Sequence, residues 1–182
     1  MNKEGRVIVL IGLMGAGKTS IGRKLAEHLD MAFVDADEEI VKAAGCSIPD
    51  IFEIYGEPAF RDVEERVISR LLTEGPVVLA TGGGAYMNPR IRSAIAQYGY
   101  SIWLKATLEV LVDRTSRRSG RPLLSAGDPR QILSDLMAAR YPVYAEADLT
   151  VETGRESVNE TLQVIVTALN RQTETQNGAP TS

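Results

Sequence analysis

Two residue types that often carry chemistry are almost absent from this chain. It contains one cysteine, Cys46, and one histidine, His28, among 182 residues. A single cysteine excludes an internal disulfide and a cysteine-based zinc site, and a reducing compartment such as the cytoplasm is therefore expected. A single histidine excludes a histidine-rich metal site and argues against a serine–histidine–aspartate triad. We assign no role to either residue.

The chain also lacks a long hydrophobic run and an excess of positive charge. The first apolar run, residues 6–11, has the length of a buried strand and is too short to span a bilayer, so no membrane partner is expected. A formal net charge of −4 argues against a nucleic-acid partner. Hydrophobic residues make up 44% of the chain and charged residues 24%, as in ordinary globular proteins. One domain is expected for this length.

Apolar runs of strand length alternate with stretches of helical spacing. Strands are expected at residues 6–11, 31–35, 76–80, 100–105 and 149–152. Helices are expected at residues 20–29, 38–44, 48–56, 57–75, 88–99, 107–118, 129–147 and 156–171. Strands separated by helices imply right-handed crossovers and a parallel sheet covered on both faces. The sequence therefore predicts an α/β fold of three layers.

Residues that typically begin or end helices refine these boundaries. Ser47 is a good N-cap, with Asp50 at the capping-box position of the helix that follows. Pro142 is expected to break the helix in which it lies. Residues 172–182 contain almost no apolar side chains, so we expect a single domain over residues 1–171 followed by a disordered tail.

The first strand runs into a glycine loop, "GLMGAGKTS" at residues 12–20, which fits G-x-x-x-x-G-K-[ST]. Such a loop turns backbone N–H groups toward an anion, and the helix that follows adds its dipole. Lys18 is expected to reach the β and γ phosphates, and the Thr19 hydroxyl to ligate Mg²⁺. A dinucleotide-binding loop is the alternative, but the Lys-Thr pair and the lack of a later Tyr-x-x-x-Lys favour a nucleoside triphosphate.

This loop alone does not decide between motors, GTPases, ATPases and small-molecule kinases. The chain has no N-K-x-D motif for guanine. Its third strand runs into "ATGGGA" rather than into an Asp-Glu pair, which argues against a motor or an AAA-type ATPase. A small-molecule kinase is the class that is left.

Two aspartates end the second strand in "FVDADEEI". Residues i and i+2 on a strand point the same way, and ligands of open α/β sheets bind beyond the carboxyl ends of the strands. Asp35 and Asp37 are therefore candidates for a metal site, for a proton acceptor, or simply for the cap of the following helix.

Six motifs together resemble the shikimate kinases: "GLMGAGKTSIGRKLA", "DAD", "IFEIYGEPAFRDVE", "TGGGA", "GRPLL" and "AARYPVYAEAD". The resemblance covers about residues 6–170. It implies transfer of the γ-phosphoryl group of ATP to the 3-hydroxyl of shikimate, on the pathway to chorismate and the aromatic amino acids. It also implies a P-loop kinase fold whose five-stranded parallel sheet has the order 2-3-1-4-5, with a lid at residues 114–129.

The resemblance assigns substrate contacts to Asp37, Arg61, Glu64, Gly82, Gly83, Gly84 and Arg140. Arg61 and Arg140 would grip the carboxylate as two planar forks, and Glu64 would orient Arg61. From spacing alone, Arg61 and Glu64 could equally form a surface ion pair. The three glycines at residues 82–84 could likewise be only a tight turn.

The resemblance also distributes the nucleotide and catalytic roles. ATP contacts are implied for Gly15, Ala16, Gly17, Lys18, Thr19, Ser20, Arg114 and Arg121. Arg114 would stack on adenine, and Arg121 would neutralise the phosphoryl group in transfer. Lys18, Asp37 and Arg121 are the implied catalytic residues, with Asp35 as an outer ligand of the Mg²⁺ held by Thr19. We expect solvated surface charges at Arg117 and Arg118.

Two other functions stay open at this point. A kinase for another polyol acid such as gluconate would share the P-loop and the general fold. A non-catalytic nucleotide-binding module would be expected to lack the base or the lid arginine, whereas Asp37 and Arg121 are both present. We expect a cytoplasmic monomer with ATP and shikimate as its partners and Mg²⁺ as its cofactor.

Overall fold

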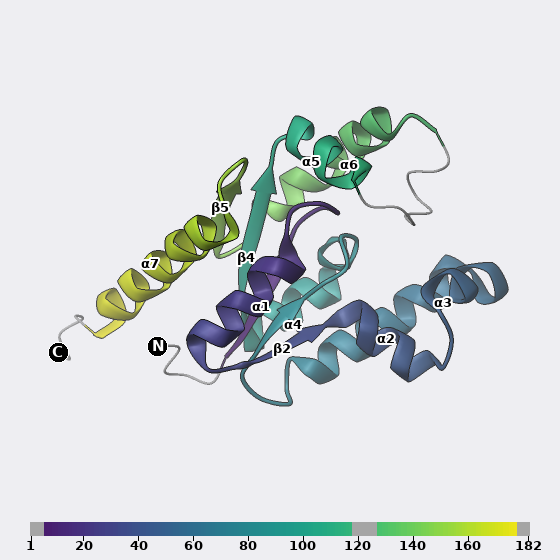
Figure 1. Ribbon diagram of the computed structural model, residues 1–182. Coiled ribbons are helices and arrows are strands. Elements are labelled where there is room, and N and C mark those ends of the chain that lie inside the picture. Colours follow the sequence, from purple (N-terminus) through teal and green to yellow (C-terminus); the bar gives the residue numbers. More distant parts are fainter. Residues whose placement is uncertain (1–5, 118–126, 178–182) are drawn as a thin grey trace.

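The computed structural model describes residues 6–117 and 127–177, with the side chains of the last helix described as far as Arg171 (Figure 1). Five strands pair in parallel in the order β2-β3-β1-β4-β5. Their bounds are β1 (Val7–Ile11), β2 (Ala32–Asp35), β3 (Val77–Ala80), β4 (Gly99–Ala106) and β5 (Leu149–Thr153). The predicted fold class and strand order are confirmed.

The burial patterns of β1 and β5 match a central and an edge position in the sheet. β1 reads Val-Ile-Val-Leu-Ile and is buried along its whole length, because it pairs on both sides and is covered on both faces. The edge strand β5 reads Leu-Thr-Val-Glu-Thr and alternates between buried and exposed side chains. The core therefore centres on β1, at whose carboxyl end the glycine loop begins.

The remaining elements are α1 (Lys18–Leu29), α2 (Ala36–Ala44), α3 (Ile48–Leu71), η1 (Ala85–Met87), α4 (Pro89–Tyr98), α5 (Leu108–Ser116), α6 (Pro129–Tyr144) and α7 (Val158–Asn177). α1 crosses one face of the sheet, with α7 beside it, and α4 covers the opposite face (Figure 1). α2 packs against α3 at one end of the molecule, and α5 packs against α6 at another. Among the described residues, none of these helices is long and apolar enough to cross a membrane.

Several predicted boundaries need correction. Pro142 does not break its helix, since α6 continues to Tyr144, two residues beyond it, and the proline lies in the last turn. α2 begins at Ala36 rather than Glu38, because Asp35 is its N-cap. α7 continues to Asn177, so residues 172–177 of the expected tail are helical. Residues 158–177 contain no glycine or proline that would end the helix earlier.

The long helix α3 is kinked where the sequence predicts two separate helices. Ser47 caps it through the predicted capping box with Asp50. At Gly56 the backbone leaves the helix, with φ 81° and ψ 171°, and Pro58 then opens the second segment. This second segment carries Arg61 and Glu64 toward the carboxyl edge of the sheet.

Candidate active site

The glycine loop between β1 and α1 is built to receive an anion. Gly15 and Gly17 have φ of 84° and 99°, which glycine adopts without strain. Gly17 is the N-cap of α1 and offers no side chain to the first amides of that helix, which is the end of a helix that favours an anion. Lys18 Nζ donates to the carbonyl oxygens of Gly12 at 2.7 Å and Leu13 at 3.1 Å, which holds the lysine across the loop.

Arg114 joins this loop to the end of β5. Its Nη1 donates to the carbonyl oxygens of Gly15 and Ala16, both at 3.3 Å, and its Nη2 donates to that of Gly154. Thr153 Oγ1 also donates to Ala16 O, at 3.5 Å. The structure thus places Arg114 beside the predicted nucleotide loop, with its guanidinium group held by backbone carbonyls. Of the other predicted ATP contacts, Ser20 is exposed in the first turn of α1.

Asp35 caps a helix, which is one of the roles left open by the sequence, and it also contacts Thr19. Its Oδ1 accepts a hydrogen bond of 3.0 Å from the Asp37 N–H and so caps α2. Its Oδ2 accepts a 3.5 Å hydrogen bond from Thr19 Oγ1. A hydroxyl and a carboxylate oxygen side by side are the hard donors that Mg²⁺ prefers. The described residues contain no group of three acidic, histidine or cysteine side chains that could hold a metal ion, so water and phosphate oxygens would complete the shell.

Asp37 lies in the first turn of α2 and is reachable by solvent, although protein surrounds most of its carboxyl group. This burial raises the pKa of Asp37, the charge of Asp35 raises it further, and the cations Lys18 and Arg61 oppose the rise. The direction of the shift favours a carboxyl group that takes up a proton more readily than an ordinary aspartate.

Arg61 and Glu64 form an ion pair in which the glutamate is buried and the arginine is partly exposed. The Glu64 side chain is 1% exposed, and Arg61 Nη1 donates to it at 2.7 Å. Burial raises the pKa of Glu64, against the hydrogen bond and charge of Arg61. The other edge of Arg61 is also occupied, because Nη2 and Nε donate to Glu57 Oε1 at 3.1 and 3.3 Å. The Arg61 guanidinium also lies over the Phe60 ring, 5.0 Å from its centroid.

The three glycines after β3 are the point on which the predicted substrate residues converge. A methyl group added at Gly82 would lie 3.1 Å from Asp37 Oδ1 and 3.3 Å from Glu64 Oε1. At Gly83 it would lie 3.0 Å from Arg140 Nη1, and at Gly84 it would lie 2.7 Å from Arg61 Nη1. The turn is therefore packed against charged groups from three helices, α2, α3 and α6, which a simple strand-to-helix connection does not require.

Some site residues were missed by the sequence reasoning, and one lies beyond the structure. Glu57 pairs with Arg61 at the i, i+4 spacing, a signal that could have been found. The buried Tyr144 hydroxyl donates to the Gly83 carbonyl, a contact without a local sequence signal. Arg121 falls outside the described residues, as does Arg118, and Arg117 is an exposed partner of Asp113 as expected.

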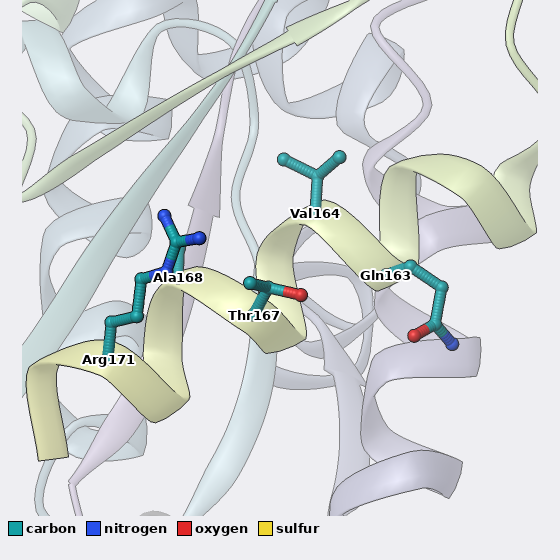
Figure 2. A pocket seen from close by; sticks show the side chains of 5 residues that line it. All are labelled: Gln163, Val164, Thr167, Ala168 and Arg171. Atoms are coloured by element: carbon teal, nitrogen blue, oxygen red, sulfur yellow. The ribbon is translucent and has the colours of Figure 1, made fainter. Parts of the chain in front are cut away.

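A hollow of about 330 Å³ lies away from these residues, along α7. All five of its lining residues belong to that helix (Figure 2): Gln163, Val164, Thr167, Ala168 and Arg171. It contains none of the predicted site residues, and nothing in the described part of the chain shows what would cover it.

A parallel sheet of this order, a P-loop at its central strand and a cluster of charged side chains beside that loop are typical of a P-loop kinase of small molecules. The family model described as "Shikimate kinase" matches residues 14–170. A shikimate kinase of Mesorhizobium japonicum is 55% identical over 148 residues, which cover 81% of this chain and 73% of that protein. The chain belongs to the shikimate kinase family.

Solved structures agree with this assignment. The shikimate kinase of Acinetobacter baumannii, solved in complex with shikimate, has a TM-score of 0.88 and 40% identity, covering 93% of this chain and 95% of that one. A gluconokinase from Sinorhizobium meliloti has a TM-score of 0.63 and 18% identity, with coverage of 95% and 96%. This second likeness shows the fold alone.

Proposed function

We propose that this chain transfers the γ-phosphoryl group of ATP to the 3-hydroxyl of shikimate. The observation that carries the proposal is the convergence of two arginines and two acidic groups, Asp37 and the buried Glu64, on the glycine turn beside the P-loop. Shikimate has a carboxylate at one end of its ring and hydroxyl groups at the other, so its recognition needs cations on one side and acceptors on the other. Its carboxylate would be gripped by Arg61 and Arg140.

Glu64 would orient Arg61 for this contact with the carboxylate. Its carboxylate accepts the Arg61 Nη1 donor at 2.7 Å and is itself buried, so it fixes the plane of the guanidinium. The glycines at residues 82–84 bring the backbone close to both arginines, where no side chain could fit without displacing them. Their amides are candidate donors to the substrate.

Asp37 is the residue proposed to orient the 3-hydroxyl and to accept its proton. Its raised pKa suits this role, since a base is most effective when its pKa approaches the working pH. Lys18 would leave the loop carbonyls to bind the phosphates of ATP. The arginines Arg114 and Arg121 are proposed to contact the nucleotide, the second as part of the lid at residues 114–129.

Mg²⁺ is proposed as the cofactor, with Thr19 as a ligand and Asp35 as an outer one. The support is the Thr19–Asp35 contact, which presents two oxygen donors toward the P-loop. Bound there with ATP, the ion would neutralise charge on the phosphates. The capping bond from the Asp37 N–H fixes the orientation of the Asp35 carboxylate.

The proposal is tested by shikimate-dependent release of ADP in a coupled assay. No release above the ATP-only background would overturn it. Arg61→Ala should raise the KM for shikimate by about 100-fold or more, because it removes a charge-assisted fork. Arg70→Ala is the matched control, since Arg70 lies on the same helix and also pairs with two glutamates, Glu39 and Glu74, at the surface. It should leave the KM unchanged.

A substrate panel tests the alternative of another polyol acid. Gluconate offered at the same concentrations should give turnover well below that with shikimate, and the reverse order would assign the chain to gluconate instead. We further propose that the chain acts as a cytoplasmic monomer without nucleic-acid or membrane partners. Size-exclusion chromatography with light scattering measures the monomer part of this proposal.

A further inference from the structure

Tyr144, on α6, contacts the glycine turn at residues 82–84. The residue lies at the end of α6 and is fully buried, with 0% of its surface exposed. Its hydroxyl donates a hydrogen bond to the carbonyl oxygen of Gly83. Its ring is held edge-on by Trp103 at 5.9 Å and by Tyr86 at 6.3 Å between centroids. The hydroxyl is therefore carried by a side chain with little freedom to move.

The Gly83 carbonyl depends on this side chain for its direction. The neighbouring carbonyls of the turn are held by backbone amides, that of Gly82 by Ala85 N at 3.2 Å and that of Gly84 by Met87 N at 3.0 Å. Gly83 O is instead held by Tyr144. In a trans peptide the C=O and the next N–H point in opposite directions, so an anchored Gly83 C=O also aims the N–H of Gly84.

Three successive glycines need such an anchor, because their peptide planes turn at little steric cost. Within the described residues, the amides of Gly82, Gly83 and Gly84 have no hydrogen-bond acceptor in the protein. Fixed in direction, they are donors available to a ligand.

Tyr144 also lies close to Arg140 at the glycine turn. The two residues lie one turn apart on α6, on the same helix face. A methyl group at Gly83 would lie 3.0 Å from Arg140 Nη1 and 3.8 Å from the Tyr144 hydroxyl oxygen. At the next residue, Gly84, the nearest group is the Arg61 guanidinium. The Tyr144 hydroxyl therefore links α6, which carries Arg140, to the glycine turn, which lies against Arg61.

We propose that Tyr144 is a positioning residue that, through the Gly83 carbonyl, holds Arg140 and the Gly84 amide in register with Arg61 for a carboxylate-bearing substrate. This inference rests on the proposed function, from which the substrate is taken. Tyr144 itself contacts neither substrate nor nucleotide in this proposal; it acts only through the backbone of the turn.

Tyr141 provides a matched control on the same helix. It belongs to the same aromatic cluster, with its ring 4.8 Å from that of Trp103, and its hydroxyl donates to the Ala106 carbonyl at 2.5 Å. Burial raises the pKa of both hydroxyls, that of Tyr141 to about 12, so both remain donors at neutral pH. The two tyrosines donate to different carbonyls. Tyr141 donates to that of Ala106 at the end of β4, and Tyr144 donates to that of Gly83 in the glycine turn.

The experiment compares Tyr144→Phe and Tyr141→Phe with the wild-type chain. Tyr144→Phe should raise the KM for shikimate about tenfold, because one hydrogen bond is lost and a partly buried carbonyl is released. Its KM for ATP should stay within about twofold of wild type, as should both KM values of Tyr141→Phe. Thermal unfolding should shift by a similar amount in the two variants, because each loses one hydroxyl group.

A double-mutant cycle with Arg140→Lys separates positioning from a general packing effect. The effects on the shikimate KM should be non-additive for Tyr144→Phe and additive for Tyr141→Phe. An unchanged shikimate KM in Tyr144→Phe, equal changes in the two tyrosine variants, or a failure of Tyr144→Phe alone to fold would each overturn the inference. A wild-type chain that is inactive with shikimate overturns the proposed function instead, and this is seen before any variant is made.

Discussion

Replacing Gly84 with alanine should weaken shikimate binding without straining the backbone. Gly84 has φ −91° and ψ −16°, a conformation open to any residue. The added methyl group, however, would lie 2.7 Å from Arg61 Nη1 and 2.8 Å from Nη2. Because non-bonded heavy atoms of this kind rest at about 3.5–4.0 Å, the guanidinium has to retreat by about 1 Å.

The size of the effect follows from what Arg61 holds. A shift of about 1 Å is enough to break one of the charge-assisted hydrogen bonds of a fork, and such a bond contributes about 1.5–3 kcal/mol. At 1.4 kcal/mol per factor of ten, the KM for shikimate should rise about 10- to 100-fold. The KM for ATP should change little, since no contact of the P-loop involves Gly84 in the described structure.

Steady-state kinetics in the Arg61→Ala background provide the control. Removing the guanidinium removes the three atoms nearest to the added methyl group, so Gly84→Ala should add little further increase in the shikimate KM. The reasoning is refuted if Gly84→Ala leaves the KM unchanged in the wild-type background. It is also refuted if the variant raises the KM by the same factor in both backgrounds.

Three further variants examine the acidic groups. Asp37→Asn should lower kcat about 100-fold or more, while calorimetry should show an unchanged Kd for ATP. In the wild-type chain, kcat should fall as the pH drops through the raised pKa of Asp37. Glu57→Gln should lower the shikimate KM by about two- to fivefold at low salt and less at high salt, because Glu57 is an exposed competitor for Arg61. Asp35→Asn should raise the Mg²⁺ concentration for half-maximal activity about tenfold or more in a titration at fixed ATP.

The fold could be predicted from the sequence because its signals are local. The P-loop unit can be recognised within a short stretch of sequence. It consists of a continuous apolar strand at residues 7–11, a glycine loop, and a helix that starts with a lysine. The capping box of Ser47 and Asp50 is equally local, and the structure confirms it. The order of the strands came from the family resemblance, since spacing alone does not determine which strands are neighbours.

The contacts of the site were less predictable because they join distant segments. Spacing placed Arg61 beside Glu64 but left their burial undecided, which depends on α3 being packed against the glycine turn. Pro142 was expected to break a helix because its distance from the helix end was unknown. The Tyr144–Gly83 bond joins residues 61 positions apart, and nothing near either residue indicates it.

The charge pattern at Gly82 is explained by ligand binding better than by folding. Asp37 and Glu64 approach the same point, and burial raises the pKa of both. A carboxyl group whose pKa is raised on folding stabilises the fold below its unfolded pKa, and that stability is lost as pH rises through the folded value. At neutral pH both groups therefore weaken the fold. Asp37→Asn should raise the Tm at pH 7 more than at pH 4 while it abolishes turnover, which separates the two roles.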